Sequence, residues 1–184
     1  MIPCPRSYFS GLENGFHKVN IHPKQKGVSK MSYVTFYRND PAAPKPNMPA
    51  HLGSNCVITY QGKLLLERRV DSDTWGLVGG GCKKWEEPDQ AMAREVYEEL
   101  GLRIPRKKFK KLKVYGDPGR IAAFKDGSVW RMVIVVYGLE LEKEPVIRIS
   151  SESKEARFFT KEEVCRLEIP VTHSDIVEEC FLNL

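Results

Sequence analysis

The sequence predicts a mixed α/β fold in which a mixed β-sheet carries helices on its faces. Short runs rich in apolar and β-branched residues, separated by glycine-containing turns, occur before and after an amphipathic segment at residues 88–100. A second amphipathic segment spans residues 175–184. An order of strands, helix, strands and helices is typical of a sheet covered by helices.

Length and composition restrict the class of protein. The chain has 184 residues, which is enough for one domain with a substantial core and short for two. Its longest apolar run, residues 132–137, is far below the roughly 20 residues that cross a bilayer, so no membrane partner is expected. The five cysteines lie scattered without a CxxC pair, and no N-terminal segment has the pattern of a signal peptide. We therefore expect reduced thiols and a cytoplasmic location.

The first part of the chain differs from the rest. Residues 1–49 contain seven prolines and little periodic apolar pattern. Because proline fixes φ and removes a backbone donor, we expect a proline-rich N-terminal extension over 1–49, followed by one domain over 50–184. Within the extension, the apolar residues 33–37 predict an edge strand.

Strands and turns follow from residue 54 onward. Residues 55–60 and 63–68 predict two strands of a hairpin around Gln61-Gly62, and residues 121–124 and 129–141 predict another around Asp126-Gly127. The apolar run within the last of these predicts a central strand covered on both faces. Shorter strands are expected at residues 75–78, 112–115 and 156–159. Residues 112–115 alternate apolar residues with lysine, as a half-buried strand does.

Two helical segments have recognisable ends. Pro88 opens the first helix and Gly101 closes it. A capping box of Thr160 and Glu163 predicts a short helix before the final one. The final helix is expected to bury a single stripe of residues: Ile176, Val177, Cys180, Phe181 and Leu184.

The first helix gathers acidic residues. Glu95, Glu98 and Glu99 are three and four positions apart, so their carboxylates share one face. Glu86, in the preceding loop, is close enough to reach the same patch. Like charges at this spacing repel one another and need a compensating cation. Carboxylate oxygens suit a hard divalent ion such as Mg²⁺, which also binds phosphate oxygens.

The segment 80–102 resembles the signature of the Nudix hydrolase family, G-x5-E-x7-R-E-U-x-E-E-x-G-U, where U is a bulky aliphatic residue. Every specified position is matched, by Gly80, Glu86, Arg94, Glu95, Val96, Glu98, Glu99, Gly101 and Leu102. The resemblance covers about residues 50–184 and implies a Nudix-like α/β/α sandwich. It also implies a metal-dependent pyrophosphohydrolase, which splits a nucleoside diphosphate linked to a group X into a nucleoside monophosphate and phosphorylated X.

The resemblance implies a role for each residue of the signature. Glu98 and Glu99 would be the principal ligands of Mg²⁺, or of Mn²⁺ in its place, with Gly80 allowing close backbone approach. Glu95 would be a ligand or the base that activates water. Arg94 would orient the glutamates, and Glu86 would pair with Arg94.

Other residues are candidates from position and charge alone. Arg68, Arg69 and Arg120 can meet substrate phosphates, and Glu152 or Glu155 can replace Glu95 as the base; each is equally explained as a surface or strand-face residue. The turn 116–119 resembles one in sugar-nucleotide hydrolases, which suggests an ADP-ribose or sugar-nucleotide substrate, but a plain turn explains it equally well. Nucleoside triphosphates and dinucleoside polyphosphates stay open as substrates. Homodimers are common among similar proteins, and a homodimer is therefore also an expectation.

Two alternatives remain open. One is a nucleotide-binding regulatory protein without turnover, a class in which the signature is often broken, whereas here it is intact. The other is an RNA-processing hydrolase, motivated by a basic cluster between residues 106 and 113. Such a run is more often a solvated face, so a nucleic-acid partner is not the favoured expectation.

Overall fold

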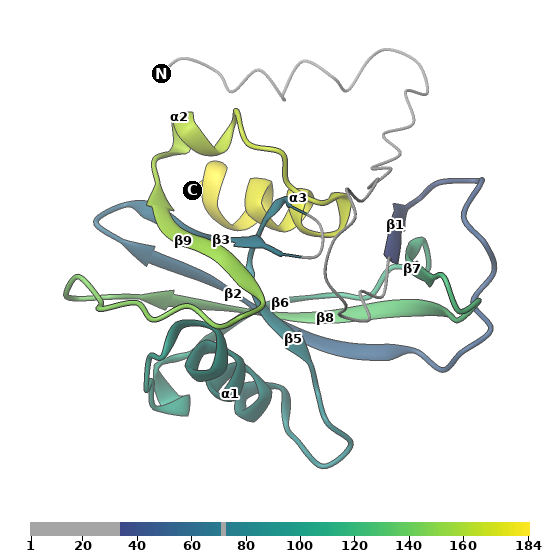
Figure 1. The fold of residues 1–184 in the computed structure, drawn as a ribbon, viewed down its shortest axis with the longest axis horizontal. Coiled ribbons are helices and arrows are strands. Elements are labelled where there is room, and N and C mark those ends of the chain that lie inside the picture. Colours follow the sequence, from purple (N-terminus) through teal and green to yellow (C-terminus); the bar gives the residue numbers. More distant parts are fainter. Residues whose placement is uncertain (1–33, 71–72) are drawn as a thin grey trace.

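The computed structural model describes residues 34–70 and 73–184, which form a mixed sheet between helices (Figure 1). The sheet path runs β1-β7-β8-β2-β3-β4, while β5 pairs with β2, β6 with β8 and β9 with β3. β2 and β8 are parallel, and the other pairs are antiparallel. The described strands are β1 (Val34–Arg38), β2 (His51–Tyr60), β3 (Lys63–Arg69), β4 (Trp75–Gly76), β5 (Val78–Gly81), β6 (Lys110–Tyr115), β7 (Arg120–Phe124), β8 (Val129–Glu140) and β9 (Ser153–Phe159).

Helices cover the two faces of this sheet. The helix α1 (Pro88–Leu100) lies on one side, and α2 (Lys161–Val164) and α3 (Val171–Val177) lie on the other (Figure 1). α3 continues into a π-helical turn, η3 (Glu178–Leu182), and a 3₁₀ turn, η2 (Arg106–Lys108), precedes β6. The prediction of a mixed sheet between helical layers is confirmed.

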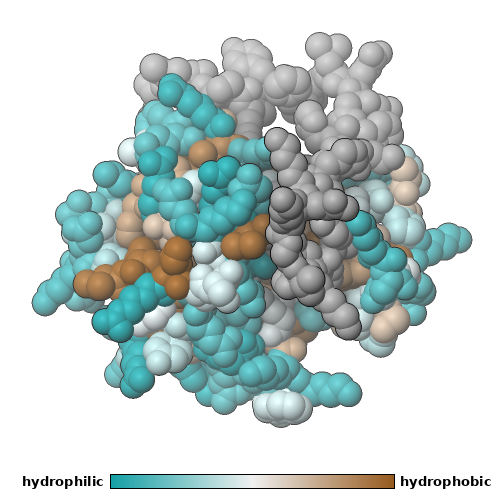
Figure 2. Space-filling view, in the orientation of Figure 1, coloured by the Kyte–Doolittle hydropathy of each residue, from teal (hydrophilic) through white to brown (hydrophobic). Residues whose placement is uncertain are grey.

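Each helical layer has its own core. Because side chains of a strand alternate between faces, β3 buries Leu65 with the cluster of α1 and buries Leu64 and Leu66 with the cluster of α3. Met92 of α1 and Ile176 of α3 are fully buried in these two clusters. The outer surface is largely hydrophilic on the side shown in Figure 2.

Both predicted hairpins are present. Gln61 and Gly62 adopt φ of 49° and 73° and join β2 to β3, as a two-residue turn of type I′ requires. In the second hairpin Gly127 adopts φ of 86°, and Phe124 N–H donates to the Ser128 carbonyl at 2.8 Å. The edge strand predicted near residue 35 is also confirmed, because β1 pairs with β7 from Val34↔Phe124.

β8 is the central strand that its apolar run predicted. It pairs with β2 over nine positions, from His51↔Met132 to Thr59↔Glu140. On its other side it pairs with β7 near its start and with β6 further along. The same long pairing brings residues of the first and second halves of the described chain into one sheet.

The expected burial of β6 is wrong. Leu112 and Val114 are 47% and 43% exposed, while Tyr115 on the other face is buried. The covered face of β6 is the one that meets η3, where Tyr115 Oη donates to Glu179 at 2.8 Å. Lys113 bonds the same carboxylate. The face of β6 that carries Leu112 and Val114 is therefore the solvent-exposed face.

The C-terminal segment begins and ends differently from the prediction. α3 starts at Val171, four residues before the expected start of the helix. Ile176 and Phe181 are buried as predicted, and so are the two residues of the stripe between them, but Leu184 is 90% exposed and lies outside it. The capping box is confirmed, because Thr160 N–H donates to Glu163 at 2.8 Å and Glu163 N–H donates to Thr160 Oγ1 at 3.3 Å.

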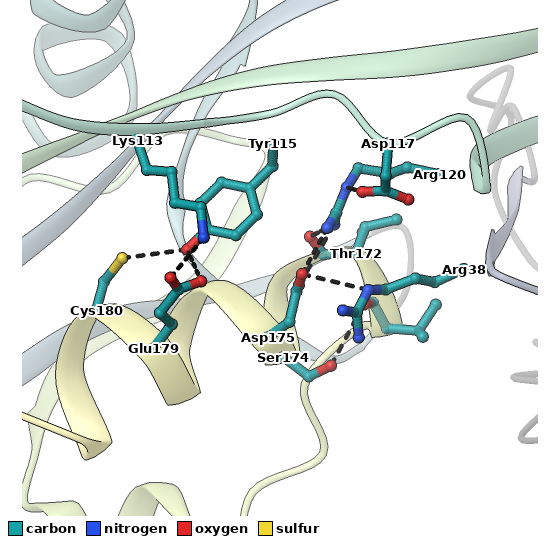
Figure 3. A network of polar contacts seen from close by, with 11 residues as sticks. Arg38, Lys113, Tyr115, Asp117, Arg120, Thr172, Ser174, Asp175, Glu179 and Cys180 are labelled. Atoms are coloured by element: carbon teal, nitrogen blue, oxygen red, sulfur yellow. Dashed lines mark hydrogen bonds and ion pairs between the residues drawn. The ribbon is translucent and has the colours of Figure 1, made fainter.

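A network of ion pairs fixes α3 against the sheet (Figure 3). Arg120 is fully buried; it donates to the Thr172 carbonyl at 2.6 Å and to Asp175 at 2.5 Å. Its Nε donates to Asp117 at 3.2 Å, and Arg38 of β1 pairs with Asp175 at 3.2 Å. A buried guanidinium is tolerated only with such partners, so the network sets where α3 begins.

The expectations about the membrane and about the cysteines have different outcomes. In the described part of the chain, no helix combines the length and apolarity needed to cross a membrane. Cys56, Cys82 and Cys180 carry free thiols, as expected, whereas Cys165 is disulfide-bonded, so the expectation of a reduced thiol is wrong there. The cytoplasmic location stays a prediction.

Candidate active site

The helix α1 presents the acidic residues because its ends and apolar face are well defined. Pro88 occupies the first turn, and Glu87 N–H donates to Gln90 at 2.9 Å. At the other end Gly101 adopts φ of 70° and its N–H donates to the Tyr97 carbonyl at 2.9 Å. The apolar face is buried against the sheet, while Glu98 is exposed and Glu95 lies against Gly80 of β5.

Arg94 organises three of the four acids. Its Nε and Nη2 donate to the two carboxylate oxygens of Glu86 at 2.7 and 2.8 Å. Its Nη1 donates to Glu95 at 2.6 Å and to Glu98 at 2.9 Å. Nη2 also donates to the Gly81 carbonyl at 3.0 Å. A planar guanidinium suits such a set of acceptors, and Arg94 holds the glutamates as the resemblance implied.

The acids differ in how readily they ionise. Hydrogen bonds from Arg94 and from the Lys83 backbone lower the pKa of Glu86 to about 2, so it is a permanent anion. Burial raises the pKa of Glu95 above its ordinary value; Arg94 opposes this, and the charges of Glu98 and Glu152 add to it. Glu95 is therefore the carboxylate of this group better suited to accept a proton.

Glu99 points inward, away from Arg94. It is 4% exposed, and its Oε2 accepts a hydrogen bond from Gly79 N–H at 2.9 Å. Nη1 of Arg69 lies 3.9 Å from its Oε1. Burial, followed by the negative charge of Glu67, raises the pKa of Glu99 to about 9. This carboxylate would be stabilised by a nearby cation in its charged form.

Glu67 is a site residue that the sequence reasoning missed. It is fully buried on β3, accepts a hydrogen bond from Ser153 Oγ at 2.5 Å and lies 3.4 Å from Nη1 of Arg69. Arg69 thus bridges Glu67 and Glu99. An acid directly after the apolar run Leu64–Leu66 was the available clue, because buried carboxylates are rare without partners.

Two glycines allow the close approach of β5 to β2 and α1. Gly79 has φ of 149°, and a Cβ there would lie 2.1 Å from the Ser54 carbonyl oxygen. A Cβ on Gly80 would lie 2.5 Å from Oε1 of Glu95. The acidic cluster therefore packs directly on the glycine backbone, as expected for Gly80.

The structure brings only some of the other candidates to this cluster. Arg69 contacts Glu99, and Glu152 is close enough to affect Glu95. Three candidates lie elsewhere or are otherwise engaged: Arg68 pairs with Asp73 at 2.9 Å, Glu155 is 3.9 Å from Arg157, and Arg120 is buried in the network under α3. The site thus uses a smaller basic and acidic set than the sequence proposed.

A cavity of about 660 Å³ adjoins the glycines. Gly79, Gly80 and Gly81 form one of its walls, and Arg69 lines it as well. The other walls come from β1, β7, β8 and the start of α3. Its aromatic and histidine lining consists of Phe36, His51, Phe124, Trp130 and His173. Such a mixed apolar and polar cavity can enclose a small organic molecule next to the acids.

The aromatic wall has a defined geometry. His51 and Trp130 meet edge to face, with ring centroids 5.7 Å apart and an angle of 78°. Phe124 and Trp130 also line the cavity, whereas Tyr115 lies under η3. A flat heteroaromatic ring therefore has contact partners on this side of the cavity.

The acidic residues have the right chemistry for a divalent ion, and their carboxylates are held by Arg94 and by the Gly79 backbone. Among the described residues, no three His, Cys, Asp or Glu side chains are arranged to hold a metal. The reason is that Nη1 of Arg94 holds both Glu95 and Glu98, while Glu99 turns toward Gly79. The all-oxygen donor set fits a hard cation.

Replacing Arg94 by lysine tests its orienting role. Lysine keeps the charge but cannot make the forked contacts, so Glu95 and Glu98 lose a common anchor. We expect kcat to fall about 10–100-fold with a smaller change in KM, the range usual for residues that orient metal ligands. Arg103→Lys, at an exposed position, is the matched control for steady-state kinetics. Equal activity of both variants would contradict the role.

Solved structures and curated relatives resemble this chain. The NUDIX domain of Shewanella oneidensis NrtR, complexed with ADP ribose, has a TM-score of 0.57 at 19% identity, covering 77% of this chain and 90% of that one. A bifunctional NMN adenylyltransferase/ADP ribose pyrophosphatase from Francisella tularensis, complexed with AMP and a Mn ion, has a TM-score of 0.54 at 20% identity, covering 73% and 43%. These likenesses show the fold.

Curated relatives match over shorter stretches. A MutT-like protein of Streptomyces ambofaciens is 38% identical over 72 residues, 39% of this chain and 47% of the relative. An RNA pyrophosphohydrolase of Photorhabdus laumondii is 48% identical over 46 residues, 25% of this chain and 26% of the relative. The match therefore spans less than half the length of these relatives. The family model for the NUDIX domain matches residues 49–180, and with its intact acidic signature the chain belongs to the Nudix family.

Proposed function

We propose that this chain is a divalent-metal-dependent pyrophosphohydrolase that acts on a nucleoside diphosphate linked to a second group. One observation carries the proposal: the Arg94-centred acids and the buried Glu99 adjoin a cavity of about 660 Å³ through a wall of glycines. The cavity can hold the organic part of a substrate while the acids meet its diphosphate. Members of this family typically depend on a divalent metal.

Carboxylates and a backbone segment would hold the ion. Glu98 and Glu99 would supply oxygen ligands, with Glu95 as a third ligand if it is not the base, and the close packing of Gly80 on Glu95 leaves the Gly80 backbone beside them. When bound, Mg²⁺ or Mn²⁺ supplies charge neutralisation for the phosphates and lowers the pKa of bound water. Arg94 would orient Glu95 and Glu98 through Nη1 while its Nε and Nη2 hold Glu86.

Two carboxylates are candidates to remove the proton from the attacking water. Glu95 is favoured because burial raises its pKa toward the range of a useful base. Glu152 is the second candidate, because its charge reaches Glu95 from the segment before β9. Glu95→Gln and Glu152→Gln separate them, since loss of the base removes the acidic limb of the pH–rate profile and loss of a neighbour only shifts it.

The proposed substrate class is ADP-ribose or a related sugar nucleotide. Phe124 and Trp130 offer contacts for a base, and the cavity is of the size that small organic ligands occupy. The Shewanella neighbour is complexed with ADP ribose, and the Francisella neighbour is named an ADP ribose pyrophosphatase. Both lend support to this choice over nucleoside triphosphates.

RNA with a 5′-triphosphate is the second candidate substrate, favoured by the curated relatives named RNA pyrophosphohydrolase. Lys110 and Lys111 are exposed on β6 and can meet a phosphate backbone. This candidate predicts RNA binding that weakens steeply with salt. The size and aromatic lining of the cavity favour the first candidate.

A substrate screen tests the proposal. ADP-ribose, other sugar nucleotides, nucleoside triphosphates and 5′-triphosphorylated RNA are incubated with the protein and Mg²⁺ or Mn²⁺. We expect AMP and ribose 5-phosphate from ADP-ribose. Release of pyrophosphate from the RNA alone would favour the second candidate. Tight nucleotide binding with no hydrolysis of any compound would favour the regulatory alternative instead.

Metal removal should change the pH dependence of stability. Folding raises the pKa of Glu99 from its ordinary value to about 9, so the folded chain binds this proton more readily than the unfolded chain. In chelator, Tm should therefore fall as pH rises from about 5 toward 9. Mg²⁺ favours the charged carboxylate and should flatten that fall. Thermal melts with EDTA or Mg²⁺ over this pH range measure the effect. Glu99→Gln should remove the difference between the two conditions in how Tm depends on pH.

A further inference from the structure

His173 is a cavity residue outside the acidic signature. It lies in α3, and its Nδ1 accepts a hydrogen bond from the Leu77 backbone N–H at 3.2 Å. Gly76 makes room for the ring, because a Cβ there would lie 3.2 Å from Nδ1 and 3.6 Å from Cε1. The Nδ1 edge of the imidazole is thus fixed against the strand that leads to β5.

This contact determines which nitrogen carries the proton. An imidazole nitrogen that accepts a hydrogen bond is unprotonated, so the neutral ring has its proton on Nε2. Burial, together with the charges of Arg69 and Arg120, lowers the pKa of His173 to about 4, against the opposing effect of Asp175. At neutral pH the ring therefore offers one N–H donor, at Nε2.

His173 lines the cavity, and its Nε2 is the ring nitrogen that does not bond Leu77. The ring lines the cavity together with Arg69 and the three glycines, while its Nδ1 edge is in contact with Gly76. Within residues 34–70 and 73–184, no protein group accepts a hydrogen bond from Nε2. A donor held toward a partly enclosed space without a protein acceptor is suited to an acceptor on a ligand.

The backbone around His173 is held firmly. The Thr172 carbonyl accepts from Arg120 at 2.6 Å, and Asp175 pairs with both Arg120 and Arg38 (Figure 3). The donor is consequently pre-positioned, since α3 cannot shift without breaking buried ion pairs. Pre-positioned donors bind anionic oxygens without the cost of ordering a side chain.

We propose that His173 is a substrate-binding residue, whose Nε2–H donates a hydrogen bond to a phosphoryl oxygen of the diphosphate chain. The chemistry of the acceptor follows from the neighbours of the ring: Arg69 lines the same cavity, and Gly79 to Gly81 connect it to the acidic cluster. This inference rests on the proposed function and adds a contact from the C-terminal helix to it.

Two substitutions separate the nitrogens of the ring. Asparagine places an oxygen near the position of Nδ1 and can still accept from Leu77, whereas glutamine places an N–H₂ group near Nε2. We expect His173→Asn to weaken binding of α,β-methylene-ADP, which resists hydrolysis, by about tenfold or more, as for one hydrogen bond to a charged group. His173→Gln should stay within about threefold of the wild type. For ADP-ribose, KM should change in parallel and kcat much less.

A purely structural histidine would give other results. His173→Asn would bind α,β-methylene-ADP like the wild type, or the affinities of both variants would fall equally. Either result overturns the proposal. If the wild type is active and His173→Asn binds the probe unchanged, only the role of His173 is rejected. If the wild type neither hydrolyses a substrate nor binds the probe, the proposed function is rejected as well. If a variant does not fold, ¹⁵N NMR of wild-type His173 decides: the Nε2 resonance must shift on adding the probe, and an unmoved resonance overturns the proposal.

Discussion

Glu98→Gln should reduce turnover of every hydrolysed substrate by more than about 100-fold, beyond the 10–100-fold usual for residues that only orient a metal ligand. Glutamine keeps the size of the side chain but removes the charge that a divalent ion requires. The carboxylate is 53% exposed, so its loss should leave the folded structure intact. Initial rates over a range of Mg²⁺ concentrations measure the effect. A lost ligand raises the Mg²⁺ concentration needed for half activity.

The matched control is Glu144→Gln, an exposed acid in the segment between β8 and β9. It changes net charge by the same amount and should leave rates and metal response unchanged. If Glu98→Gln retained the full rate at every metal concentration, the assignment of α1 as the metal-binding helix would be lost.

Gly79→Ala should lower the free energy of unfolding by about 3 kcal/mol or more, at the top of the range for backbone strain. The residue has φ of 149°, and the new Cβ would lie 2.1 Å from the Ser54 carbonyl oxygen and 2.8 Å from Asn55 Cα. Both neighbours are backbone atoms of the paired strand β2, so neither can rotate away. The shift would also take the N–H of residue 79 from Glu99. Urea denaturation with circular dichroism measures the loss.

Gly62→Ala provides the comparison. Gly62 also has positive φ, 73°, but nothing lies within 4 Å of its Cβ position. Only the left-handed conformation is then penalised, by about 1–2 kcal/mol. Similar losses in the two variants would show that β5 is not packed on β2 as described.

Local patterns in the sequence were sufficient for much of the fold. The turn at Gln61-Gly62, the opening Pro88 and the closing Gly101 each depend on backbone conformations that only a few residues favour. The arrangement of Arg94 with its glutamates could also be predicted, because residues three and four apart on a helix are neighbours. Such features need no knowledge of distant contacts.

Contacts between distant segments could not be predicted from the sequence. Nothing local distinguishes Arg120, which is buried under α3, from Arg69, which reaches the acids. Glu67 depends on Ser153 from another strand, and His173 depends on the backbone of Leu77. The exposure of Leu112 on β6 also depends on a distant contact, because η3 covers the other face of this strand.

The walls of the substrate cavity come from both ends of the described chain, β1 and α3, joined by the pair Arg38–Asp175. Contacts of such long sequence separation form late, because the intervening loop must close first. A ribosome-bound chain can thus complete its acidic helix well before it has any cavity. The nucleotide binding proposed above would then require docking of the last helix, and pulse-labelled refolding should show ligand binding lagging behind helix formation.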